Sequence, residues 1–272
     1  MPRACNLKWG DYFMPSEIRN RDSRWTEQQV KLAYYLYCQM PFGQLHARNA
    51  RVIELAKAIG RTPSAVAMKL VNLASLDPDI RESGRSGLTN ASSLDRKIWE
   101  EFHADWEKLS FECEQIISSL QIHDSEMSYD DGLDYSGETS PTVVQRRIGQ
   151  NFFRNTILAS YQHKCCMSRL SIPQLLVASH IVPWNIDKTQ RLNPRNGLCL
   201  SAIHDRAFDR GFLTVLPDMT ILVSKAIKEK SDDNQLIKEL CLLDKRKIEL
   251  PKRFSPSASL LSWHNEHIFL GD

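Results

Sequence analysis

The sequence lacks most of the features that would place it in a membrane or in an oxidising compartment. No apolar run approaches the roughly 20 residues that a membrane-spanning helix needs, and the first residues, MPRACNLKWGDYF, lack the apolar core of a signal peptide. The seven cysteines follow no framework spacing and include no CxxC pair. These absences argue against a membrane protein, a disulfide scaffold and a cysteine-bound structural zinc. We therefore expect a cytoplasmic protein with free thiols.

The net charge of +2 conceals an uneven distribution along the chain. Residues 1–108 contain 16 Lys and Arg residues and 13 Asp and Glu residues. Residues 109–144 contain 0 basic and 8 acidic residues, and residues 145–272 contain 19 basic and 12 acidic residues. The segment 123–142 is acidic and poor in apolar residues, which is typical of a linker. The length of 272 residues then predicts two domains, 1–122 and 143–272. A basic C-terminal half favours a nucleic acid partner.

Helical patterns dominate the first domain. Apolar residues recur at helical spacing over about 26–40, 50–59, 62–73 and 94–120, with a polar loop at 77–90. The second and third helices are separated by a glycine, so that about 50–74 resembles a helix-turn-helix. Such a unit would place Lys69 in a DNA major groove and Arg61 near a phosphate. Plain packing of two short helices is the alternative.

The most informative stretch is 176–212, LVASHIVPWNIDKTQRLNPRNGLCLSAIHDRAFDRGF. An apolar run ends at His180, a polar loop follows, and a second apolar run opens after Asn196 and stops at His204. Ala207 and Phe208 then suit the buried side of a short helix. The order is strand, loop, strand, helix, and we expect the three polar residues to converge at the mouth of one small unit.

This arrangement resembles the HNH nucleases, whose ββα unit holds one divalent metal. His180, Asn196 and His204 follow the HNH order, within motifs SHIxPW, NPxNGL and HDxAFDxG that look like those of the restriction-type branch. The likeness covers residues 143–215 closely and says little about residues 1–120. It implies an α+β protein with a helical N-terminal domain and a C-terminal ββα-metal nuclease domain. It also implies metal-dependent cleavage of DNA, in restriction or phage defence, with Mg²⁺ or with Mn²⁺, Ni²⁺ or Zn²⁺.

The chemistry of phosphodiester hydrolysis suits these residue types. His180 is a candidate base for the attacking water, because histidine titrates near neutral pH. His204 and Asp205 form a half-site for a divalent metal; the spacing leaves open which of them is the main ligand, and we favour His204. Asn196 suits an orienting role, since its amide can bond across the loop. Ser179 stands where many HNH proteins have a second metal ligand.

Four arginines flank the motif: Arg191, Arg195, Arg206 and Arg210. Surface arginines are ordinarily solvated, but beside a phosphate site they are suited to contact the DNA backbone. Outside the motif we expect helices over 145–161, 234–243 and 258–269, and a β-hairpin over 212–223.

Two other functions are compatible with the sequence. The serine in place of a second ligand motivates a non-catalytic helix-turn-helix DNA-binding regulator with a degenerate HNH scaffold. The acidic segment before the second domain motivates a nuclease effector that a partner or a signal molecule activates. Each of these functions is compatible with a homodimer.

Overall fold

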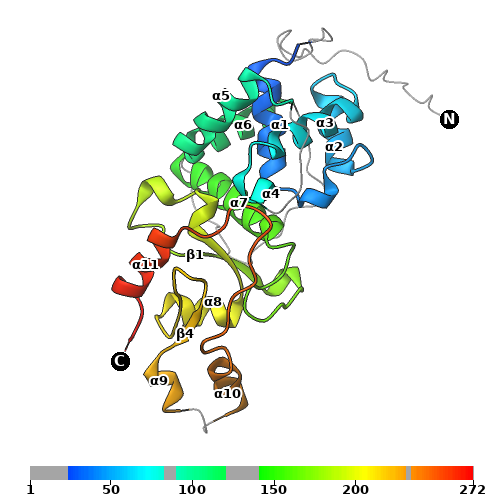
Figure 1. The fold of residues 1–272 in the computed structure, drawn as a ribbon. Helices are drawn as coiled ribbons and strands as arrows, with labels where there is room; N and C mark the ends of the chain where they lie inside the picture. The colour runs from blue at the N-terminus through cyan, green and yellow to red at the C-terminus, as the bar shows by residue number, and fades with distance from the viewer. Residues whose placement is uncertain (1–23, 83–89, 121–140, 231–233, 272) are drawn as a thin grey trace, which may run out of the picture.

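The computed structural model describes residues 24–82, 90–120, 141–230 and 234–271. These residues form an α+β protein in which N-terminal helices pack on a C-terminal half with two small antiparallel sheets (Figure 1). Among the described helices, none is long and apolar enough to cross a membrane.

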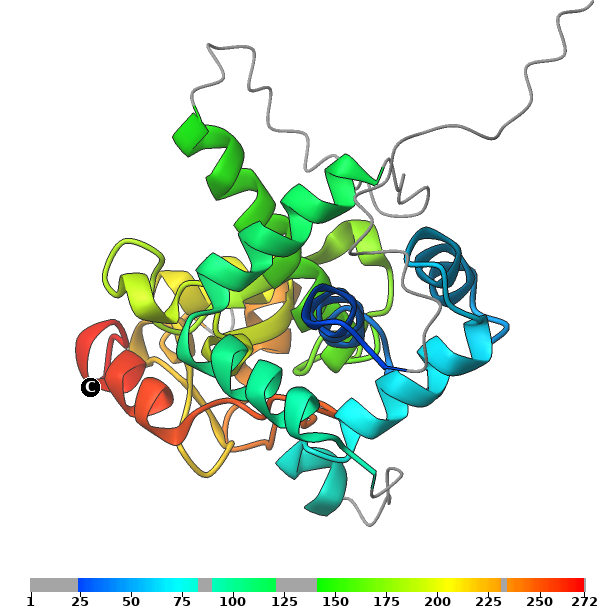
Figure 2. The same cartoon turned by 90° about the horizontal axis from the view of Figure 1, so that it is seen from above.

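The N-terminal helices are α1 (Glu27–Cys38), α2 (Ala50–Ala58), α3 (Pro63–Ala74), α4 (Pro78–Glu82), α5 (Ser93–Ala104) and α6 (Trp106–Ser119), with a 3-10 helix at Phe42–Gln44. Figure 2 shows α1 nearly end-on, with the other helices around it. Thr26 begins α1 with a capping box, and Thr62 caps α3 ahead of Pro63. The three helices predicted over 26–73 are confirmed.

The prediction of one helix over 94–120 was wrong. The chain breaks at Asp105, whose backbone angles, φ −152° and ψ 87°, are not helical, and whose side chain caps α6 by accepting from the Lys108 N–H. Phe102 and Trp106 are both buried on either side of the break. The apolar period therefore runs through the break, which is why spacing alone did not reveal it. The predicted loop at 77–90 also contains a short helix, α4.

The C-terminal half contains α7 (Pro141–Ser160), β1 (Leu176–His180), β2 (Gly197–Ser201), α8 (Ala202–Asp209), β3 (Leu213–Val215), β4 (Ile221–Val223), α9 (Lys225–Lys228), α10 (Gln235–Cys241) and α11 (Ala258–His267), with 3-10 helices at Pro173–Leu175, Lys188–Gln190 and Pro194–Asn196. The strands pair antiparallel as β1 with β2 and β3 with β4. The predicted order of strand, loop, strand, helix and hairpin is confirmed. Most of the predicted linker 123–142 lies outside the described residues. Its last two residues belong to the first turn of α7.

Arg253 joins the C-terminal half to the end of α1. Its guanidinium is fully buried and donates to the carbonyl oxygens of Tyr37 (2.6 Å), Cys38 (3.1 Å) and Met40 (2.5 Å). Carbonyl groups at a helix C-terminus have no partner within the helix and carry negative partial charge, so a buried cation suits them. The segment between α10 and α11 reaches the N-terminal helices in this way (Figure 1), and the buried apolar core is continuous between the halves. That each half folds as a separate domain stays a prediction.

His264 fixes α11 against the rest of the C-terminal half. Its ring stacks on Phe208 with centroids 3.8 Å apart, and Nε2 donates to the Phe208 carbonyl at 3.3 Å. Nδ1 is then unprotonated and accepts from the Thr214 hydroxyl at 2.9 Å. Burial lowers the pKa of His264 from 6.5 to about 4, against the smaller effect of the Phe208 carbonyl. The folded protein therefore holds this imidazole neutral.

We expect Arg253→Met to lower the free energy of unfolding by about 3 kcal/mol, because three buried carbonyl groups lose their donor at about 1 kcal/mol or more each. Urea unfolding measures this. The adjacent Lys252 is exposed, and Lys252→Met should change stability by less than about 0.5 kcal/mol. Equal effects of the two substitutions would contradict the role given to Arg253.

The neutral His264 predicts a pH-dependent stability. The unfolded chain gains a proton at this residue below pH 6.5, whereas the folded chain gains it only near pH 4. The contribution is therefore complete above pH 6.5 and is lost as the pH falls, by about 2 kcal/mol between pH 7 and pH 5. In urea unfolding, His264→Gln should remove this part of the decline. The exposed His267 is the matched control, and His267→Gln should decline as the wild type does; identical declines in all three proteins would refute the prediction.

Candidate active site

The β1–β2 hairpin lies between α7 and α8. His180, the last residue of β1, pairs with Gly197 at the start of β2. A Cβ at position 197 would lie 2.3 Å from Ile157 Cδ1 and 2.8 Å from Phe153 Cζ, so this end of the hairpin packs directly on α7. Neighbouring residues of a strand face opposite sides, and Ser179 accordingly lies on the α8 side, where it interacts with the first turn of that helix.

The imidazole of His180 is held on three sides. Phe153 stacks on it with centroids 3.9 Å apart and planes inclined by 8°, and Trp184 approaches edge-on at 5.5 Å. Nε2 lies 2.9 Å from the Arg191 carbonyl oxygen. A carbonyl only accepts hydrogen bonds, so Nε2 carries the proton and Nδ1 has the free lone pair. Burial lowers the pKa of His180 to about 4, against the smaller effect of the Arg191 carbonyl, and the ring is neutral at pH 7.

Asn196 organises the loop that holds His180. The side chain is 1% exposed. Its Oδ1 accepts from the Val182 N–H at 2.8 Å, and its Nδ2 donates to the carbonyls of Val182 and Gln190, both at 3.1 Å. All three bonds cross the loop between β1 and β2, and the Gln190 carbonyl directly precedes the residue that binds His180. The amide therefore acts on the imidazole through the loop backbone.

The motif position of His204 predicts a metal ligand, and in the structure its side chain contacts a cysteine. It lies in the first turn of α8, which Ser201 caps by accepting from the His204 N–H at 3.4 Å. Its Nδ1 lies 3.4 Å from the Cys165 sulfur. Burial alone would raise the pKa of Cys165, but the hydrogen bonds with His204 and Ser168 outweigh it and bring that pKa to about 6. Nδ1 of His204 thus contacts the Cys165 sulfur, which is not among the partners of His180.

Asp205 and Asp209 lie one turn apart on α8. Burial raises the pKa of Asp205, against smaller lowering by Ser179 and Arg206. Burial and then the charge of Asp205 raise the pKa of Asp209 to about 6. The Ser179 hydroxyl is buried and interacts with the Asp205 carboxylate. The first turn of α8 and the turn after it thus hold two carboxylates, one of which interacts with a hydroxyl, and oxygen atoms of these kinds are possible ligands for a cation.

This oxygen set fits a hard divalent cation, which takes carboxylate, hydroxyl, water and phosphate oxygens. It provides two carboxylates rather than a full cage. Over the ranges that the structure describes, no three or more His, Cys, Asp and Glu side chains are grouped so that they could hold a metal ion. Any cation here would need water or substrate oxygens to complete its shell, as a catalytic metal does.

The four arginines of the motif fall into two pairs. Arg191 donates to the Trp184 carbonyl at 2.8 Å and lies over that indole ring at 5.2 Å. Arg195 donates to the Ser255 carbonyl at 3.1 Å and pairs with an acid of α4 at 3.5 Å. Both are therefore engaged within the protein. Arg206, on α8, and Arg210, directly after its last residue, are exposed.

The two cations of the expected helix-turn-helix are held inside the N-terminal helices. Lys69 is 6% exposed, with Nζ 2.8 Å from Asp95 Oδ1 and 4.9 Å from the Trp25 ring centroid. Arg61 lies over the same indole at 5.1 Å and donates to Gln29 at 3.3 Å. The expectation that Lys69 faces a DNA groove does not agree with this burial, because the ammonium is already paired.

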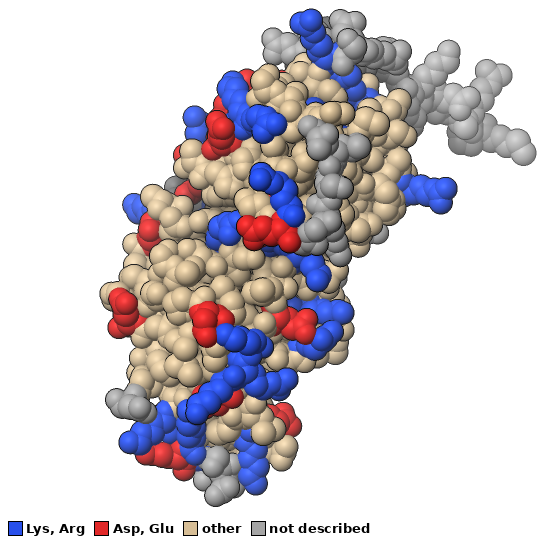
Figure 3. All heavy atoms as spheres, in the orientation of Figure 1, with Lys and Arg blue, Asp and Glu red and all other residues tan. Residues whose placement is uncertain are grey.

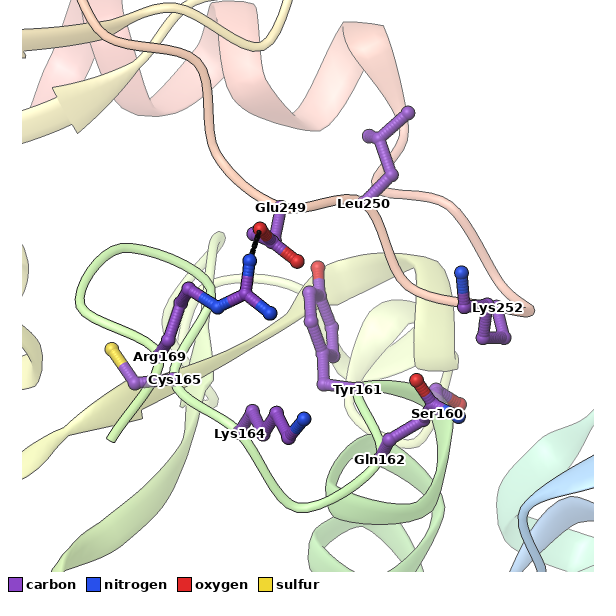
Figure 4. A pocket seen from close by; sticks show the side chains of 9 residues that line it. All are labelled: Ser160, Tyr161, Gln162, Lys164, Cys165, Arg169, Glu249, Leu250 and Lys252. Carbon is purple, nitrogen blue, oxygen red and sulfur yellow. Dashed lines mark hydrogen bonds and ion pairs between the residues drawn. The ribbon is translucent and has the colours of Figure 1, made fainter. Parts of the chain in front are cut away.

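A separate polar cavity of about 170 Å³ lies where α7 ends. Figure 4 shows Arg169 and Glu249 paired at its wall. Its lining residues include Cys165 and exclude His180 and Asn196, so it is distinct from the site around His180. On the outer surface, Lys and Arg are frequent around α9 and α10, with Asp and Glu between them (Figure 3).

Sequence reasoning missed two contacts of the site, Phe153 with His180 and Cys165 with His204. The helix predicted over 145–161 gave no role to Phe153. Two adjacent aromatic residues on one helix were the available signal, since they indicate a helix buried on two sides. For the cysteine, nothing in the spacing relates positions 39 residues apart.

The segment that contains His180, Asn196 and His204 matches a known protein family. Residues 165–216 match the model of a family described as HNH endonuclease, and no curated protein matches the chain. The matched range contains β1, the loop, β2, α8 and β3, with all the polar residues of the site. Residues 165–216, in the C-terminal half of the chain, are therefore similar to HNH endonucleases.

Proposed function

We propose that this protein is a metal-dependent DNA endonuclease in which His180 is the general base. The observation that carries the proposal is a neutral imidazole at the end of a strand, with its Nε2 proton bound to the Arg191 carbonyl. Its Nδ1 is free to accept the proton of a water as that water attacks phosphorus. A base that is neutral at physiological pH needs no prior deprotonation.

The surrounding residues hold this base in place. Asn196 fixes the loop, and the loop carbonyl fixes the tautomer of the imidazole. The exposed Arg206 and Arg210 are suited to contact phosphates on either side of the scissile bond. By the motif resemblance, the protein acts in restriction or phage defence. Its N-terminal helices then select the target, and the protein assembles as a homodimer.

We assign the cation to Asp205 and Asp209, with Ser179, rather than to His204. The charge of Asp205 raises the pKa of Asp209, and the buried Ser179 hydroxyl interacts with Asp205, whereas Nδ1 of His204 is engaged by Cys165. A bound divalent cation would neutralise charge on the scissile phosphate and assist departure of the leaving oxygen. The chain itself supplies the acceptor of the water's proton and the groups that orient it.

We expect His180→Ala to reduce nicking of supercoiled plasmid DNA, in Mg²⁺ or Mn²⁺, by about 10²-fold or more, the range for loss of a general base. His46 is exposed in the N-terminal half, and His46→Ala is the control. Undiminished nicking by His180→Ala would exclude the assignment of the base. DNA binding by the wild type without any metal-dependent product would instead indicate a DNA-binding regulator.

Mn²⁺ affinity distinguishes Asp205 from its neighbour His204 as the metal ligand. We expect Asp205→Asn to weaken Mn²⁺ binding by about tenfold or more, because one of two carboxylate ligands is lost. His204→Asn should leave Mn²⁺ affinity within about twofold. Calorimetric titration of the folded full-length variants measures both, and loss of Mn²⁺ affinity in His204→Asn alone would reverse the assignment.

A further inference from the structure

The plane of the His180 ring is not set by its own side-chain preferences. Rotation about the bond between Cβ and an imidazole has a broad profile, so packing must choose the orientation. The Arg191 carbonyl fixes the position of Nε2, but a single hydrogen bond leaves the ring free to turn about it. A second constraint is needed to aim Nδ1 at one point.

Phe153 provides that constraint from α7. The two rings are nearly parallel, at 8°, and 3.9 Å apart. Phe153 is 2% exposed, and its Cζ lies against Gly197, the residue paired with His180. Any tilt of the imidazole toward α7 would push it into the face of this ring. Trp184 contacts the ring edge-on and blocks rotation on another side.

The neighbouring residue on α7 serves a different contact. Phe152 stacks on Tyr35 of α1 at 4.9 Å and lies 6.2 Å from Trp106. It is fully buried, as Phe153 is. Consecutive phenylalanines on one helix thus face different partners, one toward the N-terminal helices and one toward the imidazole. The same substitution at the two positions separates packing in general from packing on His180.

We propose that Phe153 is a positioning residue for the reaction, whose flat ring sets the plane of the His180 imidazole and thereby the direction of Nδ1. This inference rests on the proposed function of His180 as the base. The stack acts on the orientation of the ring and makes no contact with the phosphate. Its loss therefore lowers the rate of the chemical step and leaves DNA binding unchanged.

The test is Phe153→Leu in the full chain, which keeps an apolar side chain and removes the flat face. Tyrosine is unsuitable, because its hydroxyl would extend from Cζ toward Gly197. We expect kcat for plasmid nicking to fall about tenfold to hundredfold, as a misaimed catalytic group does, with KM within about twofold. If the leucine variant does not fold, Phe153→Met replaces it with the same expectation.

Phe152→Leu is the matched control. It should lower thermal stability and keep kcat within about twofold. A wild-type kcat in folded Phe153→Leu, a rise in KM alone, or an equal loss of kcat in Phe152→Leu would each overturn the proposal.

A double substitution distinguishes this proposal from the function on which it rests. In His180→Ala, adding Phe153→Leu should cause no further loss of the residual rate, because there is no ring left to orient. A further tenfold loss would show that Phe153 acts elsewhere and would overturn the positioning role. Full activity of His180→Ala itself would instead refute the assignment of the base.

Discussion

The close packing of α7 on the β1–β2 hairpin is the constraint on which the site depends. It occurs at Gly197, where no side chain larger than hydrogen fits against Ile157 and Phe153. The same contact brings the Phe153 ring onto His180, because His180 and Gly197 are paired across the hairpin. One glycine thus permits both the approach of the helix and the burial of the base.

Burial shifts pKa values in opposite directions on the two sides of the β1–β2 hairpin. On the α7 side it keeps His180 neutral by lowering its pKa. On the α8 side partial burial raises the pKa values of Asp205 and Asp209, and the charge of Asp205 raises that of Asp209 further. Both effects oppose the charged form of the group. Under the proposed function, the neutral imidazole accepts the proton of water on one side and the carboxylates bind the cation on the other.

The N-terminal helices share one continuous apolar core with the C-terminal half that holds His180. Arg253 binds three carbonyls at the end of α1, and Phe152 packs on Tyr35. The helix that carries Phe152 also carries Phe153. The packing thus connects the N-terminal helices, through α7, to the imidazole of His180.

The amino-acid sequence alone predicted the order of the local elements and proposed the residues of the site. Strand, loop, strand and helix followed from apolar spacing, and His180 and Asn196 followed from their positions at the ends of those runs. Tertiary structure decided which atoms face each other. It gave His204 a cysteine partner 39 residues away, placed Ser179 against Asp205, buried Lys69 against Asp95 and ended a helix at Asp105 within an unbroken apolar pattern. Spacing reports which face of an element is buried, whereas partners and pKa values depend on contacts between segments distant in the chain.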